Sequence, residues 1–146
     1  MAAPLRRPVP YAELDHTADA GVVVRGESKE EALARLVLAF ADLVTGGAPA
    51  RESGEVSLRA EPGDLAAVAV DVLRELLYRF ETEGLVPESC EVLELGAEQG
   101  AVVRVGAGCY DPERHAEGLA LKAVTLHGAR FERDADGWVA EVVFDV

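Results

Sequence analysis

The protein has 146 residues, of which 27 are acidic and 14 are basic, so its formal net charge is -13. This length predicts one domain (1–146, with 1–9 as a flexible lead) that buries its own core. Hydrophobic residues make up 49% of the chain and charged residues 28%, a composition that excludes a disordered chain. The negative charge argues against broad, non-specific binding to nucleic acid, and we expect no strong direct binding. The sequence has no long apolar run and no signal peptide, so we expect a cytoplasmic, soluble protein with no membrane partner.

The first predicted elements are two short extended runs, at 11–14 and 21–25, separated by a polar segment. A helix then begins after Ser28, a favourable N-cap with Glu31 three residues later, which is the pattern of a capping box. Apolar residues recur at helical spacing until Gly46 ends the run. Residues 55–60 alternate between polar and apolar side chains and predict a strand.

A second helix is predicted to begin near Asp64 and to end at Gly84. The rest of the sequence predicts strands at 88–95, 101–106, 119–127, 129–133 and 138–144. The last two are joined by Asp134-Ala135-Asp136-Gly137, a strong hairpin signal, and residues 108–118 are the only long irregular segment.

These elements predict an α+β fold with two amphipathic helices packed on a largely antiparallel or mixed β-sheet. The sequence does not alternate strand and helix strictly, so a doubly wound parallel sheet is not favoured. Seven apolar residues of the two helices are expected to be buried: Leu33, Leu36, Phe40, Val68, Leu73, Leu76 and Phe80.

Common catalytic and phosphate-binding motifs are missing from the sequence. It has no GxxxxGK[ST], no GxGxxG opening a helix, no HExxH and no GxSxG. The two cysteines, Cys90 and Cys109, lie far apart, and with three histidines they do not favour a structural zinc site. We expect both cysteines to be ordinary core or strand residues, which leaves oxygen ligands as the remaining chemistry.

One candidate for such chemistry is the polar segment Asp15-His16-Thr17-Ala18-Asp19. Its carboxylates could bind a hard cation such as Ca²⁺ or Mg²⁺, which prefers oxygen ligands. The alternative is a polar turn in which Asp and Thr bond to their own backbone.

A second candidate is the end of the chain, where a predicted strand runs directly into Asp145-Val146. If the strand is ordered to its end, the Asp145 carboxylate and the α-carboxylate of Val146 lie close together and repel unless solvent or a cation offsets their charge. The alternative is a frayed, solvated terminus.

Lys122 is the third candidate, because it is one of only two lysines and lies in an apolar segment. Its ammonium group could face an anion beside the imidazole of His127. The alternative is a lysine whose stem covers apolar surface while its charge reaches water.

Five segments, taken together and in order, resemble the archease family. They are 11–21 (YAELDHTADAG), 28–39, 64–84, 117–127 with the form G-x-x-x-K-A-x-T-x-H, and the hydrophobic-Asp-hydrophobic end at 143–146. Members of this family usually end in Ile where this chain ends in Val, a change that keeps the α-carboxylate.

The resemblance implies an accessory protein with no catalytic residues and no organic cofactor, whose partner is a GTP-dependent tRNA-splicing and RNA-repair ligase of the RtcB type. It would promote guanylylation of the ligase's active-site histidine and so sustain multiple turnover. It also implies a divalent cation, typically Ca²⁺ with Mg²⁺ or Mn²⁺ as alternatives, bound by Asp19, Asp145 and Val146. Asp15, His16, Lys122 and His127 would have supporting or partner-facing roles.

Two other functions are compatible with the same residues. One is a metal-dependent hydrolase, in which Asp19 and Asp145 hold a catalytic cation and His16 or His127 acts as the base. The other is a small-molecule-binding module of the α+β class. Activity of the isolated chain on RNA or nucleotide would distinguish an enzyme from an activator.

Overall fold

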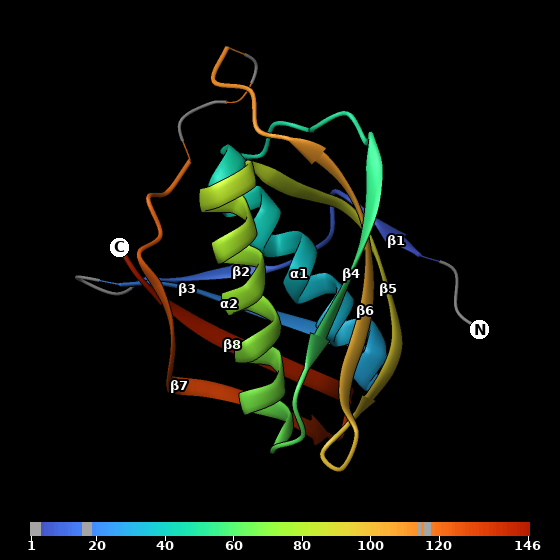
Figure 1. The fold of residues 1–146 in the computed structure, drawn as a ribbon. Helices are drawn as coiled ribbons and strands as arrows, with labels where there is room; N and C mark the ends of the chain where they lie inside the picture. The colour runs from blue at the N-terminus through green and yellow to red at the C-terminus, as the bar shows by residue number, and fades with distance from the viewer. Residues whose placement is uncertain (1–3, 16–18, 114, 116–117) are drawn as a thin grey trace.

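The computed structural model describes residues 4–15, 19–113, 115 and 118–146, with Asp15 and Asp19 described as backbone positions. This part of the chain forms two helices and eight strands (Figure 1). In chain order they are β1 (Leu5–Arg6), β2 (Ala12–Asp15), β3 (Asp19–Gly26), α1 (Lys29–Thr45), β4 (Gly54–Ala60), α2 (Leu65–Glu83), β5 (Leu85–Gly96), β6 (Gly100–Cys109), β7 (Ala123–Asp134) and β8 (Gly137–Asp145).

The strands form two four-stranded sheets, with orders β1-β5-β6-β4 and β2-β3-β8-β7. Every strand pairing among the described residues is antiparallel. Each helix contacts strands of both sheets: α1 contacts β5 and β3, and α2 contacts β7 and β4. The predicted α+β class with helices packed on antiparallel sheet is therefore confirmed.

The helices begin and end where the sequence predicts. Ser28 accepts a hydrogen bond from the Glu31 backbone N–H at 3.0 Å, and Asp64 caps α2 in the same way through Ala67 at 2.9 Å. Gly46 and Gly84 end the helices in the left-handed conformation that glycine adopts without strain. In the described part of the chain, neither helix has the length and apolar character needed to cross a membrane.

The core lies around α1, which is buried on nearly all sides. Six of the seven residues predicted to be buried are so, and Phe80 is half-buried at the edge of the core. A helix that is apolar all round must be covered on every face, and the two sheets together with α2 supply that cover. By contrast, α2 keeps an exposed face that carries Asp71, Arg74 and Tyr78.

The prediction of separate strands at 119–127 and 129–133 is wrong. The structure has one strand, β7, that begins at Ala123 and shifts register between Thr125 and Arg130, where Gly128 has a φ of 79°. Before β7, the Leu119 N–H bonds to the Leu43 carbonyl at the end of α1, and only at Lys122 does a backbone N–H reach β8, through the Asp145 carbonyl. Lys122 is therefore not part of an apolar strand.

The N-terminal lead, predicted to be flexible, contains β1 and a buried arginine. Leu5 and Arg6 pair with Cys90 and Ser89 of β5. The Arg7 side chain is only 3% exposed and lies between two carboxylates, with Asp42 at 3.3 Å and Glu88 at 3.0 Å. It also donates to the Ala48 carbonyl at 2.7 Å, so the lead is attached to both α1 and β5.

Candidate functional site

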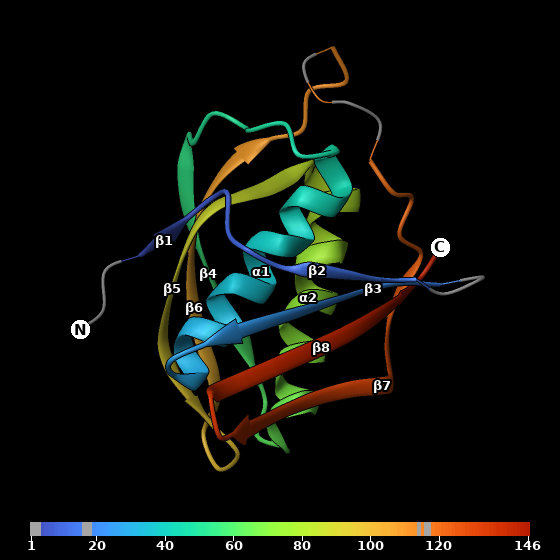
Figure 2. The same ribbon diagram turned by 180° about the vertical axis from the view of Figure 1, so that it is seen from behind.

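Two of the candidate segments meet at one end of the second sheet. In the register of β3 and β8, Asp19 lies directly opposite Asp145, and on the other side of β8 Asp145 lies opposite Ala123. Figure 2 shows the C-terminus beside the β2–β3 hairpin and the segment that enters β7. Directly opposed residues of an antiparallel pair have Cα atoms about 4.5–5.5 Å apart and share one face of the sheet.

This arrangement brings acidic residues from β2, β3 and β8 to the same end of the second sheet. Asp15 ends β2 and pairs with Ala20, the residue after Asp19. Asp145 is exposed, and Val146 retains 42% of its accessible surface. His16 lies outside the described residues. Among the side chains that the structure describes, no three of His, Cys, Asp and Glu are grouped so as to hold a metal ion.

Lys122 is held at the same end of the molecule by its backbone. Its N–H donates to the Asp145 carbonyl at 2.8 Å, and its side chain is exposed. His127 lies further along β7, beyond Thr125, which pairs with Val143. It is exposed, and its carbonyl accepts a hydrogen bond from the Thr125 hydroxyl at 3.0 Å.

The third histidine, His115, is occupied by structural contacts. It is buried and stacks on Tyr110, with ring centroids 5.2 Å apart. Its Nδ1 accepts from the Asp111 N–H at 2.6 Å, and its Nε2 lies 3.2 Å from the Pro49 carbonyl. Because Nδ1 accepts a hydrogen bond, Nε2 carries the proton and donates to Pro49, so neither nitrogen is available as a base.

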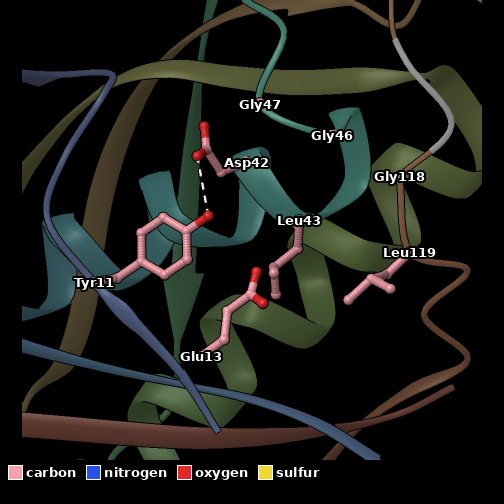
Figure 3. Close-up of a pocket in the computed structure, with 8 residues that line it drawn as sticks. All are labelled: Tyr11, Glu13, Asp42, Leu43, Gly46, Gly47, Gly118 and Leu119. Atoms are coloured by element: carbon pink, nitrogen blue, oxygen red, sulfur yellow. Dashed lines mark hydrogen bonds between the residues drawn. The ribbon is translucent and has the colours of Figure 1, made fainter. Parts of the chain in front are cut away.

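A cavity of about 340 Å³ opens between β2 and the end of α1 (Figure 3). Its wall includes Tyr11 and Glu13, and the Tyr11 hydroxyl donates to Asp42 Oδ2 at 3.0 Å. The remaining lining residues are Leu43, Gly46, Gly47, Gly118 and Leu119.

Gly118 is explained by its close approach to α1. A Cβ at this position would lie less than 3.0 Å from the backbone of Leu43 and Val44, so any side chain would push the segment off the helix end. Sequence reasoning did not assign a role to Glu13, Asp42 or Gly118. The glycine of the 117–127 motif was the only available signal.

Tyr11 is predicted to ionise only near pH 12. Burial, followed by the negative charge of Asp42, raises the pKa of Tyr11 from 10.0 to about 12. The stabilisation by the neutral hydroxyl is therefore complete below pH 10.0 and is lost as the pH rises through about 12. The measurement is the tyrosinate absorbance of the wild type minus that of Tyr11→Phe, and a difference that titrates at the ordinary value would contradict the structure.

Comparison with known proteins gives a consistent result. The model of the archease protein family matches residues 11–146. A protein archease from Methanopyrus kandleri is 39% identical over 140 residues, which cover 94% of this chain and 100% of that relative. A protein archease from Pyrococcus furiosus is 32% identical, with 93% of this chain and 98% of that relative covered.

Solved structures show the same fold. The solution structure of a Methanobacterium thermoautotrophicum protein superposes with a TM-score of 0.70 at 26% identity, covering 93% of this chain and 98% of that one. A crystal structure from Thermotoga maritima, described as an archease and possible chaperone, has a TM-score of 0.60 at 22% identity, with 97% and 98% covered.

Proposed function

Because the chain belongs to the archease family, we propose that it is an accessory protein that activates a GTP-dependent RNA ligase of the RtcB type. Its action would be to promote guanylylation of the ligase's active-site histidine and so to sustain repeated turnover in tRNA splicing or RNA repair. The family match over residues 11–146 is the observation that carries the proposal.

The charge of the chain supports a protein partner rather than RNA. A net charge of -13 repels phosphate backbones, whereas it attracts the basic surface of an RNA-binding enzyme and speeds their encounter. Asp15, His16 and His127 would contribute to the partner-facing surface.

We further propose that Asp19, Asp145 and the α-carboxylate of Val146 bind one divalent cation, with Ca²⁺ as the first choice and Mg²⁺ or Mn²⁺ as alternatives. The β3–β8 register supports this set, since residues directly opposite each other can present carboxylates to the same ion. These are the hard oxygen donors that such cations prefer. When bound, the cation would neutralise carboxylates that otherwise repel one another.

Lys122 and the histidines would have roles other than binding the cation. The Lys122 N–H holds the Asp145 carbonyl at 2.8 Å and so fixes the end of β8, while the exposed ammonium group has no ion-pair partner among the described residues and can meet an anion. Such an anion could be a phosphate of the ligase's nucleotide. In this proposal the described histidines act as surface or structural groups and not as bases.

The proposal is tested by measuring ligase guanylylation and RNA joining with and without substoichiometric amounts of this protein. We expect the protein alone to leave RNA and GTP unchanged and to raise the number of ligation cycles per ligase. Hydrolysis of either substrate by the purified chain would instead favour a metal-dependent hydrolase, and unchanged ligation would reject the activator role.

Lys122→Ala should impair activation without unfolding the protein. The backbone contact to Asp145 survives this substitution, so the free energy of unfolding should change by no more than about 0.5 kcal/mol, as expected for an exposed side chain. Activation is measured by guanylylation and stability by urea denaturation. A large loss of stability would make Lys122 a structural residue instead.

A further inference from the structure

The cavity beside β2 has features that the proposed cation site does not use. Figure 3 shows the Glu13 carboxylate pointing toward Tyr11 and Leu43 at the wall of this space. Glu13 is exposed, and it has no hydrogen-bond or ion-pair partner among the described residues. Asp42, the other acidic residue of the lining, is already paired with Tyr11 and Arg7.

The electrostatic character of the cavity is therefore negative. No lysine, arginine or histidine is among its lining residues. Its upper wall is the C-terminal end of α1, where the helix dipole is negative, and the last turn of α1 carries no basic residue. A cation placed there would be stabilised by both the helix end and the Glu13 carboxylate.

The residues that line the cavity suit a long side chain with a flat charged head. Tyr11 supplies an aromatic ring, and Leu43 and Leu119 supply apolar surface for a hydrocarbon stem. The cavity is open at Gly47, because a Cβ added to this residue would meet no atom within 4 Å. Leu119 is 42% exposed, so part of its apolar surface is accessible to a ligand in the cavity.

We propose that this cavity, the Tyr11–Glu13 pocket, binds the guanidinium side chain of an arginine on the protein partner. Guanidinium is planar, stacks on aromatic rings and pairs with a carboxylate through two parallel hydrogen bonds, which matches a wall of one tyrosine and one free glutamate. A single free carboxylate makes the pocket a poor site for a divalent cation, which needs several oxygen ligands. The identity of the partner rests on the proposed function, but the pocket's preference for guanidinium does not.

The preference is tested directly with a small probe. N-acetyl-arginine amide is titrated into the labelled protein, and the NMR signals of Tyr11, Glu13 and Leu119 are followed. The neutral analogue N-acetyl-citrulline amide is the control, since it keeps the shape and removes the charge. We expect the arginine probe to shift these signals at concentrations where citrulline does not, and Glu13→Gln to abolish the difference. Equal shifts for both probes, or shifts spread over the whole acidic surface, would overturn the proposal.

The role in partner binding is tested with the RNA ligase. Glu13→Gln should weaken the complex about tenfold, as for the loss of one charge-assisted contact. Glu98→Gln is the matched control, because it removes the same charge from the exposed β5–β6 turn and should change the dissociation constant less than twofold. Equal effects of the two variants would reject the pocket as the arginine site. If the ligase does not bind at all but the arginine probe does, the proposed function fails while the pocket assignment stands.

Discussion

Replacing Arg7 with alanine is expected to lower the free energy of unfolding by about 3 kcal/mol. The Arg7 guanidinium is 3% exposed, and it is paired with Asp42 and Glu88, whose side chains are 19% and 11% exposed. Removing it leaves two largely buried negative charges without their counter-ion and also frees the Ala48 carbonyl. The effect lies at the lower end of the range for broken buried ion pairs because Asp42 still reaches some solvent.

Arg6 provides a matched control in the preceding residue. Its side chain is 67% exposed, and its only ion pair among the described residues is with the half-exposed Glu52 at 3.3 Å. Arg6→Ala should therefore change stability by no more than about 1 kcal/mol. Both variants are compared by urea denaturation. Similar small losses for the two would mean that the N-terminal lead is not fixed to the core through Arg7.

The sequence was sufficient to predict the elements whose signals are local. Capping residues and glycines set both ends of α1 and α2, and these signals depend only on a few neighbouring residues. Polar–apolar alternation likewise located β4 and β8. These elements can therefore be predicted without knowing which parts of the chain pack beside them.

The sequence was not sufficient where the structure depends on distant partners. The segment before β7 is held at the end of α1 by the hydrogen bond between Leu119 and Leu43. The lead is held by Arg7, whose partner carboxylates lie 35 or more positions away in the sequence. A charged residue among prolines carries no local sign that it will be buried. Polar–apolar alternation within one strand likewise does not predict which strand will pair with it.

The candidate cation site combines local sequence signals with a dependence on distant partners. The sequence identifies Asp19 and Asp145 as separate candidate ligands, but only the strand order β2-β3-β8-β7 makes them neighbours. The sequence linked them solely through family resemblance. Glu13 is missed because one glutamate on a short strand looks like any solvent-facing residue until α1 ends beside it.

Asp145→Asn and Asp19→Asn should each weaken Ca²⁺ binding at least tenfold and abolish most ligase activation. Each change keeps the size of the side chain while removing one negative oxygen ligand, so the loss reflects charge and coordination. The double variant should lose less than the sum of the two single losses, because both residues serve one ion. Calcium binding is measured by titration calorimetry, and activation by ligase guanylylation.

Asp136→Asn controls for the change in net charge, since this exposed residue lies in the turn at the opposite end of β8. It should bind Ca²⁺ like the wild type. Residues appended after Val146 should reproduce the loss, because they replace the α-carboxylate with a neutral peptide carbonyl, whereas an N-terminal extension should not. Additive losses for Asp19 and Asp145, or full calcium binding and activation by the extended chain, would show that these groups do not share a single cation.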